Sequence, residues 1–495
     1  MKTKKLGYLL LGIGILLIIF GFASDWIGLG KKGIQSAQLL IIQAGIAVSA
    51  ISAGFIGLKE EDFRFSVTAN RLISRLVEAP TSTWILIGFF IVFVLLFVFP
   101  MFFNNDRAID YFTGYVPDIR PIGRDLSFNT SSIRNWLDGK GLYDYENHYY
   151  PPLYAVVFSP FLLLEYPYTY FVMTTITLAC AIISGLVIPS LLMKDKDRTL
   201  PLFFFITVIF SYGMQFELER GQFNILAFTF SLLAIYIFHR YFAFRHFAYL
   251  LISISAQIKL YPAIFMALFI KDWRDWKGNL LRFAGLGAFN IALLFVLGIR
   301  VFQDFLNAVP TLIGAVWIRP YNHSLTAFVN ELTTTGLGIL QPETVSNLSG
   351  QAAILKLTLL LIYIACFVVV ITRSYINDDH GINFDLLLVC TIGALIIPSV
   401  SIDYKLPLLS PALALALTHS PRSMGGVRGV LRAFLLVGIS LAYSLTLFSF
   451  VYRPAWLGNS FPLFMVILIA FTFLNVVDRH TYPSLDEWKH DSQQG

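Results

Sequence analysis

Side chains that could carry out chemistry gather in a few short polar segments of an otherwise apolar chain. The first segment is a loop over residues 104–150, which holds seven carboxylates. One of them, Asp125, directly follows Arg124 at the start of the sequence DLSFNTSSIRNWLDGKGLYD. A carboxylate held beside a hydroxyl nucleophile can take its proton as that nucleophile attacks. The carboxylates of this loop, Asp125 among them, are therefore candidates for chemistry of this kind.

Further polar groups interrupt or border the apolar runs in the second half of the chain. Lysine and arginine are suited to binding phosphate, whereas carboxylates and amides can accept hydrogen bonds from sugar hydroxyls. Together they could hold a phosphate-linked sugar. The candidate substrate-binding residues are Glu219, Arg220, Gln222, Asn224, Lys259, Tyr261, His323, Ser324, Asp403, Tyr404 and Lys405, with Glu217 beside the first of them.

The elements that must position these groups are expected to be transmembrane helices. The chain has 495 residues, of which 57% are hydrophobic and 13% charged, whereas soluble domains contain about 25% charged residues. We predict an all-α polytopic membrane protein with about 12–14 transmembrane helices. The apolar runs are 6–27, 37–57, 83–103, 168–192, 200–213, 223–239, 281–298, 351–372, 384–400, 406–418, 430–451 and 461–477, with two shorter ones at 247–258 and 262–270.

The distribution of basic residues predicts the orientation. Cytoplasmic N- and C-termini place 22 of the 36 Lys and Arg residues on the cytoplasmic side, as the positive-inside rule requires. Loops 104–150 and 299–350, and every candidate residue, then fall on the extracytoplasmic side. A charged group at the bilayer centre costs about 2.5–3.5 kcal/mol. We therefore expect these groups to share a polar cavity or to reach the lipid headgroups.

Two segments need separate interpretations. Residues 151–165 cannot cross the membrane without reversing later loops, and we expect a juxtamembrane helix on the outer surface. The runs 247–258 and 262–270 are each too short for a bilayer of about 30 Å. We predict a short hairpin with Lys259 at its outer tip, and one kinked span is the alternative.

Local structural roles compete with substrate binding. Glu219 could pair with Arg220, Asp403 could pair with Lys405, and Lys259 could extend to the headgroups. Gln222 and Asn224 could instead cap a helix, and His323 could make only a loop hydrogen bond.

The predicted organisation has three parts. Residues 1–80 form a transmembrane hairpin and a cytoplasmic linker, residues 81–345 a catalytic core, and residues 346–495 further transmembrane helices. Cys180, Cys366 and Cys390 lie in apolar runs and are expected to be core residues, because no spacing suggests a metal or disulfide site. The net charge of +6 follows the membrane orientation and does not indicate nucleic-acid binding.

Five segments resemble glycosyltransferase family 87. They are residues 125–144 followed by Tyr-Pro-Pro-Leu at 150–153, and residues 220–224, 258–262, 322–325 and 401–406. The family often has histidine-rich sequence where this chain has Ile402 and Asp403. The resemblance implies a GT-C fold and an inverting transfer, mostly of mannose, from a polyprenyl phosphate to a lipid or glycan acceptor. It implies that Asp125 is the base, and we expect no metal cofactor.

A secondary transporter of a polar or lipid-linked solute is the alternative from another class. Transporters usually contain structural repeats and a site at the membrane midplane. Here the sequence contains no visible repeat, and the polar groups fall on one face. The sequence therefore favours a membrane enzyme, with membrane lipids around it.

Overall fold

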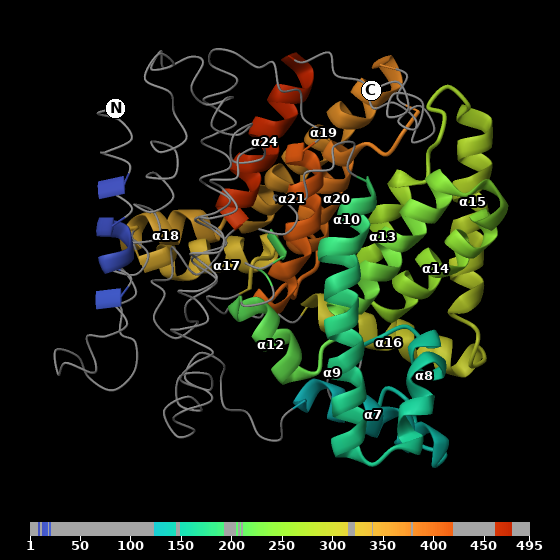
Figure 1. Ribbon diagram of the computed structural model, residues 1–495. Coiled ribbons are helices and arrows are strands. Elements are labelled where there is room, and N and C mark those ends of the chain that lie inside the picture. Colours follow the sequence, from blue (N-terminus) through green and yellow to red (C-terminus); the bar gives the residue numbers. More distant parts are fainter. Residues whose placement is uncertain are drawn as a thin grey trace.

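The computed structural model describes residues 8–9, 12–17, 19–20, 123–144, 149–192, 204–205, 208, 211–314, 322–338, 340–377, 380–418 and 461–477. These residues form a helical bundle (Figure 1). Within them, the only extended pairing is an isolated antiparallel bridge between Asn322 and Ile402. The prediction of an all-α chain is confirmed for this part of the protein.

Two of the described helical segments are long and apolar enough to cross a membrane. They are Tyr168–Leu192 and Ala352–Asn377, with 25 and 26 residues. At 1.5 Å per residue each is nearly 40 Å long, which exceeds a hydrocarbon core of about 30 Å. Phe171 and Ile354, on these segments, are exposed, as expected for apolar side chains that face lipid.

The bundle consists of these segments and several shorter helices. The first segment is built from α9 (Tyr166–Ile182), a π-helical turn η4 (Ile183–Val187) and α10 (Ile188–Leu192), and the second is α19 (Ala352–Asn377). The others are α13 (Asn224–Arg240), α14 (Arg245–Ile258), α15 (Trp276–Leu293), α20 (Phe384–Ile396), α21 (Leu409–Thr418) and α24 (Phe461–Val477). Every residue of α20 except Asp385 is buried, so this uniformly apolar helix lies inside the bundle.

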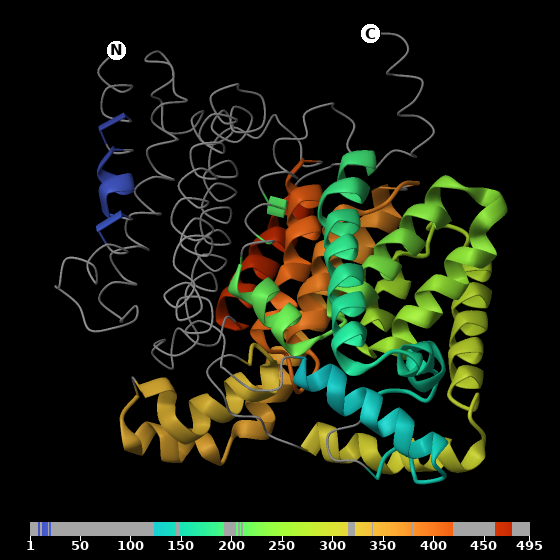
Figure 2. The same ribbon diagram turned by 60° about the horizontal axis from the view of Figure 1, so that its bottom comes forward.

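One end of the bundle carries the elements that hold most of the polar motifs. They are α7 (Arg124–Leu137), α8 (Leu153–Phe158), η3 (Ser159–Leu163), α12 (Tyr212–Arg220), α16 (Ile299–Gly314), α17 (Leu325–Thr335), η7 (Gly336–Gly338), α18 (Pro342–Ser349) and η8 (Asp403–Leu408). Figure 2 shows α7, α16 and the α17–α18 pair lying across this end. The predicted juxtamembrane helix at 151–165 corresponds to α8 and η3.

The chain reverses at Lys259, as the hairpin prediction required. From α14 it continues into a 3₁₀ helix, η6 (Tyr261–Leu268). Tyr261 Oη donates to Asn224 O at the start of α13, 2.7 Å away. Leu268 O lies 2.9 Å from His239 Nε2 near the end of α13. These two contacts show that η6 runs alongside α13 in the same direction as α13, whereas α14 runs in the opposite direction. The segment is therefore a hairpin, and the kinked-span alternative is wrong.

Several predictions fall wholly or largely outside the described residues. They concern residues 1–80, the apolar runs 83–103 and 430–451, most of the run 200–213, and residues 104–122 of the first polar loop. The division of the chain at residues 80 and 345 stays a prediction.

Candidate active site

Two glycine turns bring the first polar loop against the end of α12. Gly123 and Gly221 both adopt positive φ, at 75° and 62°, a conformation that costs side-chain-bearing residues about 1–2 kcal/mol. Gly123 N donates to Glu219 O at 2.6 Å. A Cβ atom on Gly221 would lie 2.8 Å from Leu126 Cβ. This close approach places Asp125, in the first turn of α7, beside the residues that end α12.

Asp125 is held by two partners and stays partly open. Gln222 Nε2 donates to its Oδ2 at 2.5 Å, and Arg220 Nη1 lies 3.5 Å from its Oδ1. Its side chain is 26% exposed. The carboxylate is thus oriented from the protein side, and part of it can be reached by a ligand.

Lys259 lies on the other side of Gln222. Its ammonium donates to Gln222 Oε1 at 2.9 Å and to Tyr150 Oη at 3.0 Å. It also lies 4.6 Å and 4.3 Å from the ring centroids of Tyr150 and Phe223, within the range of cation–π attraction. The residue is only 8% exposed. One amide therefore connects the candidate base with a buried cation.

Aromatic rings line this part of the site. The ring of Tyr150 stacks on that of Tyr154 with a centroid distance of 4.8 Å, and Tyr154 stacks on Phe158 at 4.4 Å. Phe223 contacts all three rings. The sequence analysis quoted Tyr150 within a motif but did not select it as a site residue. Its position directly before two prolines, at the end of the polar loop, was the available signal.

Glu217, on α12, is buried, and its carboxylate lies at the N-terminus of α13. Its oxygens accept hydrogen bonds from Asn224 Nδ2 at 2.8 Å and from Ile225 N at 3.0 Å. Glu217 lies outside the candidate membrane spans. Burial raises its pKa to about 7, although these hydrogen bonds and the charge of Lys259 act in the opposite direction. Gln222 and Asn224 thus form side-chain hydrogen bonds with other candidate residues and do not act only as helix caps.

The segment η8 contributes Tyr404 and Lys405 to the same cluster. Lys405 Nζ donates to Val400 O at 2.8 Å and lies 5.4 Å from the ring centroid of Tyr261. Burial, and then the charge of Lys259, lower the pKa of Lys405 to about 7. Burial and the nearby carboxylate of Asp125 raise the pKa of Tyr404. These electrostatic effects place Lys405 near Lys259, and Tyr404 near Asp125.

His323, Ser324 and Asp403 have internal partners. His323 Nε2 lies 2.7 Å from Asp403 Oδ1, and both side chains are fully buried. Ser324 caps α17 by accepting from Ala327 N at 3.0 Å, and it donates to Ser399 O at the same distance. These bonds fasten the start of α17 to the strand-like residues before η8. These hydrogen bonds of the three side chains go to protein groups and therefore stabilise the local fold.

Arg220 and Glu219 form the local pair that was considered as the alternative to substrate binding, and their binding role stays a prediction. Arg220 Nε lies 3.3 Å from Glu219 Oε2, and the same guanidinium group reaches Asp125. Asp403 and Lys405 do not form the local pair considered as an alternative, because Asp403 bonds to His323 and Lys405 to a carbonyl group.

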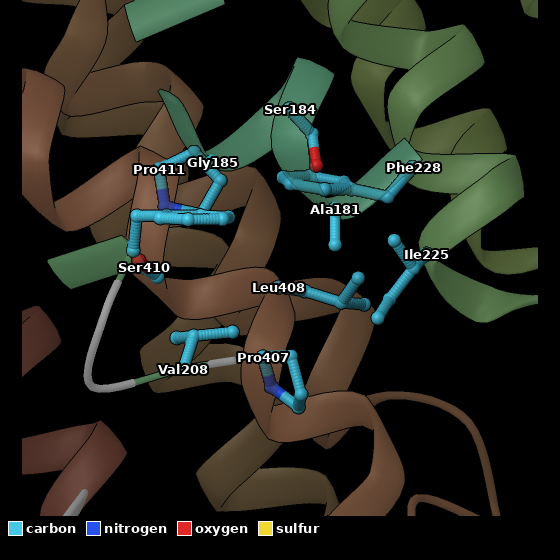
Figure 3. A pocket seen from close by; sticks show the side chains of 11 residues that line it. Ala181, Ser184, Gly185, Val208, Ile225, Phe228, Pro407, Leu408, Ser410 and Pro411 are labelled. Carbon is cyan, nitrogen blue, oxygen red and sulfur yellow. The ribbon is translucent and has the colours of Figure 1, made fainter. Parts of the chain in front are cut away.

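A small, mostly apolar cavity lies between the α9–η4 segment, α13 and the η8–α21 segment (Figure 3). It is lined by Ala181 and Gly185 of the α9–η4 segment, Ile225 and Phe228 of α13, and Pro407 of η8, among others. Its free volume is about 10 Å³, close to the space needed by one water molecule. It contains neither Asp125 nor Lys259 and is too small, as it stands, for a sugar or a prenyl chain.

The polar cluster has the chemistry of a transfer site. It combines a partly open carboxylate, the buried lysines Lys259 and Lys405, and aromatic rings. Among the residues that the structure describes, no group of three or more His, Cys, Asp or Glu side chains could hold a metal ion. The expectation of a metal-independent reaction stays a prediction.

Comparison with known proteins identifies the family. The sequence model of glycosyltransferase family 87 matches residues 148–398, about half of the chain. The match includes Gln222, Lys259 and His323, whereas Asp125 and Asp403 lie outside it. No curated protein and no solved structure matches the chain. The protein belongs to glycosyltransferase family 87 and is a glycosyltransferase.

Proposed function

We propose that the protein is an integral membrane, inverting glycosyltransferase that uses a polyprenyl-phosphate sugar. The transferred sugar is mannose, and the acceptor is a lipid or glycan on the extracytoplasmic side. The observation that supports this proposal best is the bridge formed by Gln222, which binds Asp125 and Lys259 at once. The bridge brings a base for the acceptor hydroxyl close to a cation for the donor phosphate.

The transfer step follows from this arrangement. The acceptor hydroxyl attacks the anomeric carbon of the sugar while Asp125 takes its proton. The bond between the anomeric carbon and the phosphate oxygen breaks, and its electron pair stays on the phosphate. Polyprenyl phosphate leaves, and the new glycosidic bond forms on the opposite face of the sugar. A single catalytic carboxylate is sufficient, in contrast to the carboxylate pairs of glycosidases.

Three basic side chains of the cluster could stabilise the leaving phosphate. Negative charge builds up on that group in the transition state, and preorganised cations lower the barrier. Lys259 is the first of them, because it is buried and its partners are neutral or aromatic. The charge of Lys259 helps to lower the pKa of the nearby Lys405, and Arg220 pairs with Asp125. The rings of Tyr150 and Phe223 could pack against the sugar or the first prenyl unit.

The membrane setting supports a lipid-linked donor. The chain has a mean hydropathy of +0.70, and its polar cluster lies at one end of a helical bundle with exposed apolar faces. The positive-inside distribution of Lys and Arg favours a location of that end outside the cytoplasm. We propose a polytopic protein with both termini in the cytoplasm.

The test is transfer by the purified protein. Radiolabelled polyprenyl-phosphate mannose, polyprenyl-phosphate glucose and a nucleotide sugar are each supplied with a membrane lipid extract, with and without a chelator. We expect labelled product from polyprenyl-phosphate mannose, unaffected by the chelator. Transfer from the nucleotide sugar alone would contradict the proposed donor class. Preference for glucose would contradict only the proposed sugar.

A further inference from the structure

A cluster of basic residues lies at the end of the bundle opposite the candidate active site. It is formed where α13 ends, α14 begins and η6 leads into α15 (Figure 1). The 17 residues of α13 separate it from Gln222 by about 25 Å. It therefore takes no part in the transfer step derived above.

Three cations converge on one part of this end. Arg245 and Arg282 lie with their guanidinium carbons 5.3 Å and 5.2 Å from the ring centroid of the same residue, Phe238. The charges of Lys271, Arg245 and Arg282 all act on the imidazole of His239. The three cations are half-buried. Like charges held this close repel one another unless an anion compensates them.

The nearby carboxylates are already engaged with the backbone. Asp272 Oδ1 accepts from Arg274 N at 2.8 Å, and Asp275 Oδ1 accepts from Gly278 N at 3.0 Å. Arg282 donates to two neutral oxygens, Phe269 O and Asn279 Oδ1. Lys271 has no hydrogen bond or ion pair to any residue within the described ranges. Residues 271–282 contain four basic side chains and two carboxylates, so positive charge is in excess here, and the ammonium group of Lys271 has donors to offer a ligand.

A second observation points to a ligand at this place. Trp273, two residues after Lys271, is 7% exposed, and its indole Nε1 is buried without an acceptor among the described residues. A buried donor left without a partner costs about 1–3 kcal/mol. A phosphate or glycerol oxygen would satisfy it.

Exposed aromatic residues indicate the source of that ligand. Tyr241, Phe244, Phe247 and Trp276 flank the cluster and are each more than two-fifths exposed. Aromatic residues exposed at the ends of membrane helices typically lie at the depth of the lipid headgroups. A phosphate group at this depth belongs to a phospholipid.

We propose that Lys271, Arg245 and Arg282, with the indole N–H of Trp273, bind the headgroup phosphate of an anionic phospholipid. Arginine is suited to this role because its guanidinium group can donate two parallel hydrogen bonds to phosphate. Basic pockets between transmembrane helices bind acidic headgroups in the same manner. The site rests on the membrane location of the bundle, but not on the identity of the sugar donor.

Lipid binding to the purified full-length protein tests this proposal. The protein in detergent is titrated with phosphatidylglycerol, phosphatidylcholine or glycerol 3-phosphate, and retained ligand is measured by native mass spectrometry. We expect phosphatidylglycerol to bind more tightly than the other two. Lys271→Gln should weaken its binding roughly tenfold, the effect of losing one charge-assisted hydrogen bond. The matched control is Lys277→Gln. The Lys277 ammonium lies 5.5 Å from the ring centroid of the exposed Trp276, and this variant should bind phosphatidylglycerol as tightly as the wild type.

The outcomes separate the possibilities. Equal retention of phosphatidylglycerol and phosphatidylcholine, or an unchanged affinity in Lys271→Gln, would overturn the site. Glycerol 3-phosphate binding as tightly as phosphatidylglycerol would overturn the lipid as the ligand. Arg282→Lys keeps the positive charge and loses the guanidinium fork, so it should bind less tightly than the wild type. The assay contains no sugar donor, so its result does not depend on the proposed transferase reaction.

Discussion

Gln222 is the residue whose replacement tests the geometry of the candidate active site most sharply. Its amide donates to Asp125 Oδ2 at 2.5 Å and accepts from Lys259 Nζ at 2.9 Å. A hydrogen bond to a charged group contributes about 1.5–3 kcal/mol. In Gln222→Leu, loss of only one such bond from the transition state would lower kcat/KM roughly 10- to 150-fold. The assay is transfer of radiolabelled mannose from polyprenyl phosphate, with kcat and KM measured separately.

Two further variants divide this effect into its parts. In Gln222→Glu the new carboxylate can accept from Lys259 but cannot donate to Asp125, so we expect a low kcat with a donor KM near that of the wild type. Gln257→Leu is the matched control, because Gln257 is also 3% exposed but donates to Asn290 on α15. A fully active Gln222→Leu enzyme would refute the bridge. An equal loss in Gln257→Leu would show that the effect is one of stability.

Three other changes have distinct expected results. Lys259→Ala should raise the donor KM or lower kcat, and unchanged values of both in the same transfer assay would reject a phosphate role. Burial raises the pKa of Glu217 from 4.5 to about 7, so between pH 4.5 and 7 the folded state binds more protons than the unfolded state. The free energy of unfolding therefore decreases as the pH rises through this window. Thermal unfolding of Glu217→Gln should lack this part of the pH dependence. His323→Ala should remove the hydrogen bond between Nε2 and the fully buried carboxylate of Asp403 and destabilise the protein by about 1.5–3 kcal/mol. A lowered Tm with a nearly unchanged donor KM in the remaining folded enzyme would reveal this effect.

The polar motifs of the sequence indicated which residues gather at the site, but they did not indicate how these residues contact one another. Asp125, Gln222 and Lys259 were all selected from the sequence, and the structure brings them together. The bridge itself joins residues 97 and 37 positions apart, and no local pattern encodes such contacts. Their catalytic and binding roles stay predictions.

His323 and Asp403 illustrate a limit of the same reasoning. Both lie in polar motifs next to apolar runs, which is equally typical of a ligand contact and of a buried pair. They are 80 positions apart and form a hydrogen bond with no exposed surface. Only the folded structure distinguishes a ligand contact from a buried pair. In it η8 packs against α12, and Gly213 leaves no space for a Cβ atom beside Asp403 O.

The helices of the fold could be predicted from the length and apolar character of continuous segments of the sequence. Uniformly apolar runs predicted α13, α19, α20 and α24, and the short runs around Pro262 predicted the reversal at Lys259. Helix length was harder to predict, because α20 ends at Ile396 although its apolar run continues to residue 400. Irregular segments thus extend some apolar runs, and only two described segments are long enough to span a membrane as continuous helix.

The most direct test of the proposed chemistry is to measure donor binding and sugar transfer in the same preparation of Asp125→Asn. The amide keeps the size of the carboxylate but cannot accept the acceptor's proton, while Lys259 and its partners are untouched. We predict donor affinity within a few-fold of the wild type and a loss of transfer of at least 10²-fold, the scale expected for a general base. Transfer at the wild-type rate by this variant would contradict the role of Asp125.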